Sequence, residues 1–186
     1  HAKQKVKDKL EKLFTDTSYK INNLEHQLME EIVDNSYTLI KGTAPVIKDK
    51  TLIISSNAKV ASIVEDEFDD RNLTNALIHN FSNVRVIKFT KDESFIKDAL
   101  DISRDYNNII IYSYDAYNDN VQKEVINSLL KEDKDVFVVS IKGPIDRGYF
   151  KNLKNYACLY EYTPNSIKTI VKQLKGEIKL NGHLPE

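Results

Sequence analysis

Three polar residues stand where short apolar runs of the sequence give way to loops, and they are the first candidates for chemistry: Asn57, Asp115 and Asp146. Asn57 follows two serines, a series whose hydroxyl and amide groups can hydrogen-bond a polar ligand. Asp115 and Asp146 offer carboxylates, which serve in ion binding and in acid–base catalysis. Each residue also has a structural interpretation, because Asn and Asp commonly cap the helix or turn that follows them.

The spacing of glycine argues against a nucleotide site. Dinucleotide and Walker loops need several glycines directly after the first strand, where the backbone approaches a phosphate closely. No glycine occurs between Gly42 and Gly143, and the series after the first predicted strand is Ser-Ser-Asn. The same series lacks the acidic pair that would hold Mg²⁺ beside a phosphorylated Asp115. A receiver-type regulatory domain is therefore disfavoured, although Lys142 follows a later strand.

Neither a metal centre nor a covalent nucleophile is predicted. No two of the four histidines lie at metal-ligand spacing. The one cysteine, Cys158, lies in an apolar run, so we expect a buried thiol and no internal disulfide. No G-x-S-x-G elbow is present. We therefore expect no catalytic residue, no metal and no cofactor in this chain.

The balance of charge bears on the partners of the protein. The 186 residues include 27 Lys and Arg against 28 Asp and Glu, a net charge of −1. This balance argues against binding to nucleic acid or to anionic membranes through bulk charge. No window of the sequence is apolar enough to predict a membrane span. The compartment is not assigned.

The positions of these residues depend on alternating strands and helices. A helix is predicted from residue 22 or 23 to about Ser36, with Leu24, Leu28 and Ile32 along one stripe. Runs rich in Ile and Val then alternate with amphipathic segments, a pattern typical of a parallel sheet covered on both faces. We expect a three-layer α/β/α sandwich with a mainly parallel, doubly wound sheet of about five strands. The strands are predicted at 51–55, 84–89, 108–112, 135–141 and 156–160, and the helices at 60–68, 73–81, 95–102, 121–130 and 163–174.

Residues 1–20 differ from the rest of the chain. Val6, Leu10, Leu13 and Phe14 have helical spacing among lysines and acidic residues, which predicts a narrow amphipathic helix. A short isolated helix is marginal in water, so this segment is expected to pack on another part of the protein, or else to be a solvated arm.

The C-terminal quarter of the sequence resembles a known family. The run YEYTPNSI at 160–167 is followed by GEIKLNGHLP at 176–185, and KGPID at 142–146 precedes Phe150. This series is similar to the end of the C-terminal domain of glycoside hydrolase family 3, in particular the bacterial β-N-acetylhexosaminidases, and residues 25–41 resemble the start of that domain. Four positions depart from the family pattern: Ile145 replaces an aromatic residue, Glu161 a glycine, Leu180 a proline and His183 a basic residue.

The resemblance implies a two-domain parent enzyme. An N-terminal (β/α)₈ barrel would carry a catalytic Asp and an Asp/His acid–base pair, and would hydrolyse terminal β-linked N-acetylglucosamine. Residues 1–20 would be the helical connector from that barrel, and 21–186 the non-catalytic C-terminal domain. In the glucosidase branch this domain supplies an acid/base Glu, but the intervening loops do not align, so no Glu of this chain is assigned to that role. If loops of this domain approach the sugar site of the parent, the substrate-proximal candidates are Asn57, Asp115 and Asp146, because they lie at strand ends.

Two alternatives remain open at this point. The chain can be a binding module that stands alone, with a flavodoxin-like fold and a small polar or phosphorylated ligand. It can also be a receiver-like regulatory domain, which would require Mg²⁺-dependent phosphorylation at Asp115.

Overall fold

The computed structural model describes residues 23–56 and 73–184. Two of the predicted helical segments, 1–20 and 60–68, lie outside the described residues, and so does Asn57.

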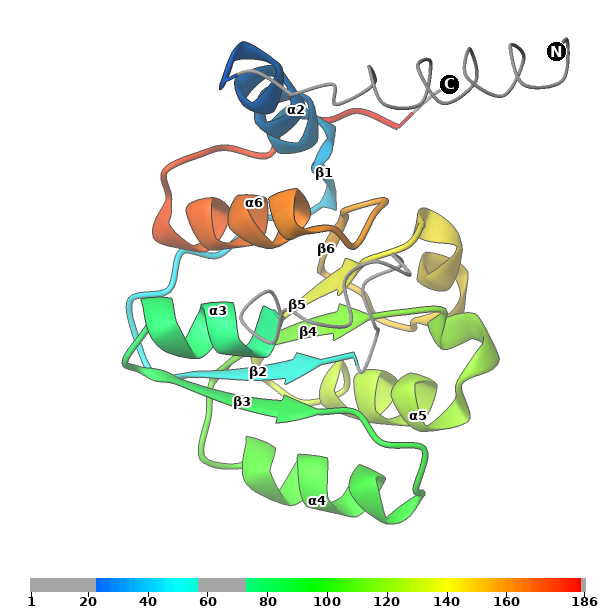
Figure 1. Ribbon diagram of the computed structural model, residues 1–186. Helices are drawn as coiled ribbons and strands as arrows, with labels where there is room; N and C mark the ends of the chain where they lie inside the picture. The colour runs from blue at the N-terminus through cyan, green and yellow to red at the C-terminus, as the bar shows by residue number, and fades with distance from the viewer. Residues whose placement is uncertain (1–22, 57–72, 185–186) are drawn as a thin grey trace, which may run out of the picture.

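The described part of the chain is a six-stranded sheet between two layers of helices (Figure 1). The strand order is β1-β6-β5-β4-β2-β3, in which β2 to β6 run parallel and β1 pairs with β6 antiparallel. The predicted α/β/α sandwich with a mainly parallel sheet is confirmed. The strands are β1 (Thr38–Lys41), β2 (Thr51–Ser55), β3 (Val84–Lys88), β4 (Asn108–Ser113), β5 (Asp135–Ser140) and β6 (Asn155–Cys158). The helices are α2 (Asn23–Ser36), α3 (Leu73–Asn80), α4 (Ser94–Ser103), α5 (Asn120–Leu129) and α6 (Pro164–Lys175), with 3₁₀ turns η2 (Ala116–Asn118) and η3 (Pro144–Tyr149).

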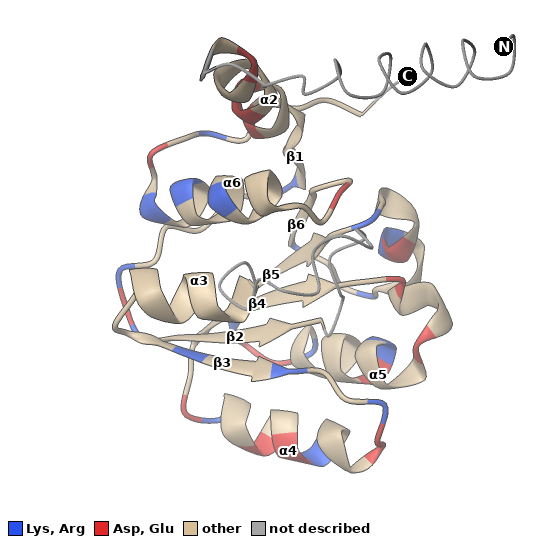
Figure 2. Ribbon diagram, in the orientation of Figure 1, with Lys and Arg blue, Asp and Glu red and all other residues tan. Residues whose placement is uncertain are grey.

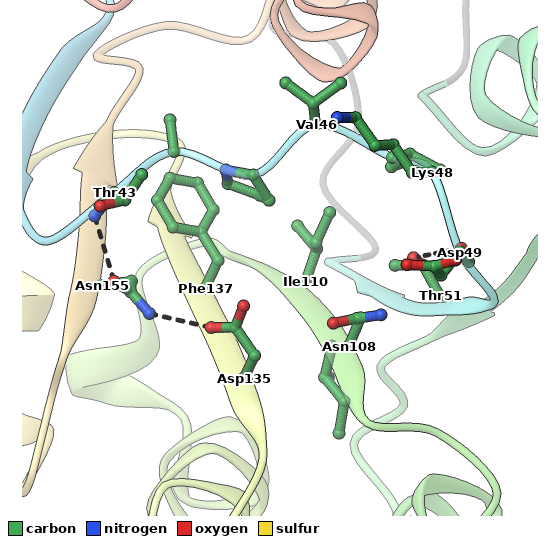
Figure 3. A pocket seen from close by; sticks show the side chains of 14 residues that line it. Thr43, Val46, Lys48, Asp49, Thr51, Asn108, Ile110, Asp135, Phe137 and Asn155 are labelled. Carbon is green, nitrogen blue, oxygen red and sulfur yellow. Dashed lines mark hydrogen bonds between the residues drawn. The ribbon is translucent and has the colours of Figure 1, made fainter.

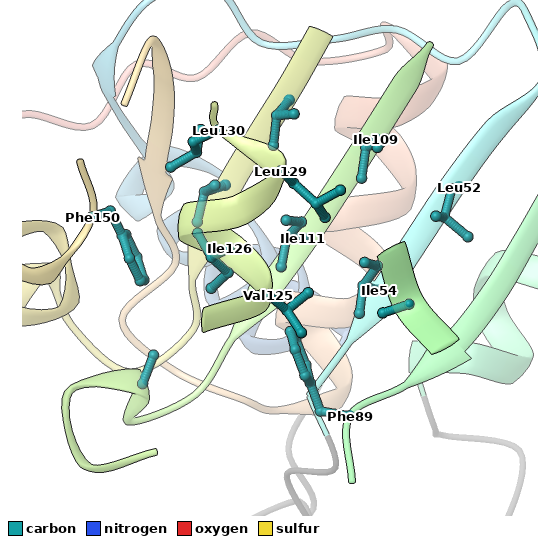
Figure 4. Close-up of a cluster of buried hydrophobic side chains, with 14 of the residues drawn as sticks. Leu52, Ile54, Phe89, Ile109, Ile111, Val125, Ile126, Leu129, Leu130 and Phe150 are labelled. Carbon is teal, nitrogen blue, oxygen red and sulfur yellow. The ribbon is translucent and has the colours of Figure 1, made fainter. Parts of the chain in front are cut away.

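The central strands are apolar at consecutive positions because both of their faces are buried. In β4, Ile109 and Ile111 face α4 and α5, whereas Ile110 and Tyr112 face α3 and α6. Figure 4 shows the first of these two layers, with Val125 of α5 against the sheet. All four of these β4 side chains are at most 2% exposed. Burial of this kind stabilises the fold by about 1.5–3 kcal/mol for each large side chain.

Helix boundaries follow local capping chemistry. Asp119 precedes α5 and accepts a hydrogen bond from the Gln122 amide. Thr163 and Ser166 form a reciprocal capping box at the start of α6, where Pro164 occupies the first turn. Gly176 ends that helix in the left-handed conformation at φ 78°. The predicted last helix is confirmed at both ends.

One strand was not predicted. The sequence indicated about five strands, and β1 is a sixth, added antiparallel at the edge beside β6. Tyr37 follows α2, just before this strand, and is completely buried in the α3/α6 layer. The four residues of β1 are extended because they pair with β6, a distant contact that no local pattern reports.

We predict that Ile110→Ala lowers the free energy of unfolding by about 2–4 kcal/mol, because it leaves a cavity in a layer that cannot collapse around it. Ile78→Ala is the control, since Ile78 lies on α3 with 57% of its surface exposed, and a change within about 0.5 kcal/mol is expected. Urea unfolding followed by circular dichroism gives both values. Equal losses in the two variants would contradict this assignment of the core.

Candidate functional site

The carboxyl ends of β2, β4 and β5 meet at one edge of the sheet. The Ser56 amide donates to the Tyr112 carbonyl, and the Ile141 amide donates to the Ser113 carbonyl, so the chain leaves three adjacent strands at the same level. Strand β2 pairs with β3 on one side and with β4 on the other, so the chain places the next two strands on opposite sides of β2. The switch point of this fold, where ligands commonly bind, therefore lies between the ends of β2 and β4.

Asp115 follows β4, one of the two strands at that switch point, and forms an ion pair with Lys142 after β5. Its backbone is in the left-handed region, with φ 49° and ψ 38°, a conformation that is uncommon outside glycine. Its Oδ2 lies 2.8 Å from Lys142 Nζ. The hydrogen bond that Lys142 donates to Asp115 raises the pKa of the lysine. Asp119, not Asp115, caps the following helix.

Asp146 is buried, with only 3% of its surface exposed, and its carboxylate points into the domain. Oδ1 accepts a hydrogen bond of 3.1 Å from the Tyr117 amide. Oδ2 lies 3.1 Å from Ser113 Oγ and 3.3 Å from Ser140 Oγ. Tyr156 extends this network, because its hydroxyl donates to Ser140 Oγ over 2.7 Å. The carboxylate thus joins η3 to the ends of β4 and β5 and to the loop after β4.

A glutamine that sequence analysis did not single out holds the same loop. Gln122 of α5 accepts from the Tyr114 amide through Oε1 and donates to the Tyr114 carbonyl through Nε2, both over 3.1 Å. Lys123 Nζ donates to the Tyr117 carbonyl over 3.1 Å. Periodicity gives no signal for Gln122, because a polar residue next to Val121 is expected on the solvent face of the helix. The loop before α5 is consequently held by side chains of α5 and η3.

The outer side of this edge carries apolar and aromatic side chains. Ile145 is 66% exposed and Tyr149 is 49% exposed. The ring of Tyr149 lies 6.3 Å from that of Tyr117, in a tilted pair. Asp115, Lys142 and these three residues give the carboxyl edge a partly exposed surface of mixed polar and aromatic character.

A cavity opens at the opposite edge of the sheet (Figure 3). It measures about 260 Å³ and lies beneath the segment that links β1 to β2, at the amino ends of β4 and β5. Phe137 and Ile110 form its apolar part, and Asp135 accepts a hydrogen bond of 3.1 Å from Asn155 Nδ2. Of the predicted site residues that the structure describes, neither Asp115 nor Asp146 lines this cavity. The sequence did not indicate it, because its lining comes from segments far apart in the chain.

Metal-ligand clusters and the one thiol of the sequence are the remaining candidates for chemistry. No group of three His, Cys, Asp or Glu side chains suited to a metal ion occurs among the described residues. Cys158 is completely buried, and burial raises the pKa of its thiol to about 11. The thiol is therefore protonated at neutral pH and is not an active nucleophile. Among the same described residues, none of the helices has the length and apolarity needed to cross a membrane.

Gly182 of the C-terminal motif is required for steric reasons. Gly182 passes the end of α2, and its amide donates to the Tyr37 carbonyl over 3.3 Å. A Cβ at this position would lie 2.6 Å from the Ser36 carbonyl oxygen. The tail therefore fits beside the α2–β1 junction only without a side chain. This part of the family-like motif supports the fold and does not contribute a reactive group.

No protein-family model and no curated protein matches this sequence. Among solved structures, a glycoside hydrolase family 3 β-N-acetylglucosaminidase from Paenibacillus is similar, with a TM-score of 0.73, 22% identity and coverage of 91% of this chain. A fungal multi-domain family 3 β-N-acetylglucosaminidase has a TM-score of 0.68 and 20% identity over 88% of this chain. A β-glucosidase from Listeria innocua has a TM-score of 0.65 and 11% identity over 87%.

This chain spans only part of each of those proteins: 34% of the Paenibacillus enzyme, 19% of the fungal one and 26% of the Listeria one. The three likenesses show a shared fold. The resemblance to glycoside hydrolase family 3 that the sequence motifs predicted is confirmed at the level of that fold, as a single domain of larger proteins.

We predict that Asp146→Ala lowers the free energy of unfolding by about 2–4 kcal/mol, because it leaves the Tyr117 amide without its acceptor and removes one partner from each of two buried hydroxyls. Asp98→Ala, an exposed carboxylate on α4, should change it by less than about 0.5 kcal/mol. Chemical denaturation measures both. An Asp146→Ala protein as stable as the Asp98→Ala control would show that the network contributes nothing.

We also predict that Cys158 makes the fold sensitive to alkali. The ordinary pKa of its thiol is 9.0 and burial raises it to about 11 in the folded protein, so the folded state holds the proton more tightly than the unfolded chain. The contribution is complete below pH 9 and is lost as the pH rises toward 11. Tyr37 and Tyr112 also have pKa values raised by burial, so they too weaken the fold at high pH. Chemical denaturation between pH 8 and pH 11 gives the free energy of unfolding against pH for the unchanged protein and for Cys158→Ala. The contribution of the thiol is the difference between the two slopes. Identical slopes would refute it.

Proposed function

We propose that this chain is the C-terminal α/β/α domain of a two-domain family 3 glycoside hydrolase. The parent enzyme hydrolyses terminal β-linked N-acetylglucosamine, and residues 21–186 form its non-catalytic domain. The observation that carries this proposal is the match of 91% of the chain to 34% of a Paenibacillus β-N-acetylglucosaminidase. The ordered motifs at 142–150, 160–167 and 176–185 support the same family branch.

Catalysis belongs to an N-terminal (β/α)₈ barrel of the parent in this proposal. Such a barrel needs about 250 residues, more than the 186 of this chain. A retaining glycosidase places two carboxyl groups about 5–5.5 Å apart, one as nucleophile and one as acid. At the carboxyl edge described above, Asp115 is paired with Lys142 and Asp146 is enclosed by hydrogen bonds. Neither carboxylate is therefore free to act as an acid or a nucleophile. This arrangement favours a non-catalytic role for the domain.

The carboxyl edge is the part of the domain that we propose to face the sugar site. Asp115 and Lys142 are partly exposed there, at 28% and 56% of their side chains. Asp146 would not contact the sugar, since its oxygens face inward. It would instead hold η3 against the loop that follows β4. Asn57 directly follows Ser56 of this edge and remains a candidate by that position alone.

The test is hydrolysis of a chromogenic N-acetyl-β-glucosaminide by two proteins, this chain and the full-length natural gene product. We expect no turnover above the buffer rate for the chain, and turnover within the usual range of about 1–10³ per second for the full-length protein. The corresponding β-glucoside serves as the substrate control.

Turnover by the chain alone would overturn the non-catalytic role. Hydrolysis of the β-glucoside but not of the N-acetylglucosaminide by the full-length protein would overturn the substrate assignment and leave the domain assignment standing.

A further inference from the structure

Helix α2 is attached to the domain by its charged face. Lys168 Nζ of α6 lies 2.6 Å from Glu30 Oε1, and Lys172 Nζ lies 2.7 Å from Asp34 Oδ2. Thr169 adds a hydrogen bond to Asp34. Val33 is the one hydrophobic side chain of α2 that is buried. Figure 2 shows the lysines along α6 and the acidic residues on α2.

The apolar face of α2 is consequently turned outward. Leu24, Leu28 and Ile32 recur every fourth residue and are 72%, 55% and 59% exposed, and the neighbouring Met29 is 46% exposed. A surface helix normally buries this stripe and exposes its charges. Here the arrangement is reversed, and four large side chains on one short helix form a contiguous apolar patch. Such a patch marks a surface that another element covers.

We propose that residues 6–14 of the same chain cover this patch as the first helix of an antiparallel helical hairpin. The segment carries Val6, Leu10, Leu13 and Phe14 at helical spacing. From Val6 to Phe14, and from Leu24 to Ile32, both stripes span about 12 Å at 1.5 Å per residue. The stretch 15–22 between the segment and α2 has the length usual for helix–helix connections, about 2–8 residues.

Charge favours the same pairing. Residues 6–14 contain three lysines and two acidic residues, a net charge of +1, and Lys3 and Lys5 precede them. Helix α2 contains four acidic residues and no Lys or Arg. Two of these acids, Glu30 and Asp34, are paired with α6. The exposed Glu31 borders the apolar stripe and lies within reach of a lysine on a helix packed there.

A second copy of the chain is the competing occupant. A stable dimer buries about 800 Å² on each partner, more than four partly exposed side chains on a helix of 14 residues provide. A segment tethered next to α2 instead binds at an effective concentration in the millimolar range. Packing on α2 would also stabilise the segment as a helix, because an isolated short helix is only marginally stable in water. The inference is independent of the proposed function, since it concerns only how this chain covers its own surface.

Hydrogen–deuterium exchange of the full chain, read by mass spectrometry, tests the proposal. In the unchanged protein we expect amides of residues 6–14 to exchange about tenfold or more slowly than an unstructured peptide. Leu28→Asp places a charge in the centre of the patch and should return them to the unstructured rate. Ile78→Asp is the matched control, an exposed isoleucine outside the patch at 57% exposure, and should leave them protected. Protection of β4 in each variant verifies that the domain is folded.

The reciprocal variant Leu10→Asp should release the same amides. Unstructured exchange of residues 6–14 in the unchanged chain would overturn the proposal. Protection that survives Leu28→Asp would overturn it as well, because the segment would then pack elsewhere. Protection that depends on protein concentration, with a dimer by light scattering, would assign the patch to a second copy. None of these outcomes bears on the hydrolysis assay, so the two proposals fail separately.

Discussion

The constraint on which the structure depends is burial of both faces of the parallel sheet. Strands such as β4 and β5 are apolar at nearly every position, so each face requires a layer of helices. Apart from Tyr112, the polar residues of β4 and β5 consequently stand at the first and last positions of each strand. At the carboxyl edge they are used mainly for support, because Asp146 and Gln122 hold the loops and Asp115 is paired with Lys142. The domain therefore presents a shaped, partly aromatic edge without a described pair of free acids.

Much of the fold was predictable because the signals were local. Runs of Ile and Val predicted the parallel strands β2 to β5, and Thr163, Pro164 and Gly176 marked the last helix by their own capping preferences. Strand β1 was not predictable in this way, since its extended form depends on pairing with β6 at the other end of the chain. The cavity at the amino edge, lined from four separate segments, was missed for the same reason.

The candidate site was predictable in position and not in orientation. Asp115 and Asp146 do lie at the carboxyl edge, where the topology places them. Whether each side chain points outward depends on partners from other elements: Lys142 after β5 for Asp115, and Ser113, Ser140 and the Tyr117 amide for Asp146. No sequence spacing reports such partners. The outward turn of the apolar face of α2 was hidden likewise, because it results from the lysines of α6.

These features describe a domain with a packed core and, among the described residues, no free pair of acids at its carboxyl edge. Its likeness to about a third or less of each similar enzyme agrees with this view. The most direct measurement is the coding sequence of the natural gene upstream of residue 1. The account predicts an open frame encoding a (β/α)₈ barrel, about 250 codons or more, with a catalytic Asp and an Asp/His pair. A start codon within a few positions of residue 1, with no barrel before it, would contradict the account.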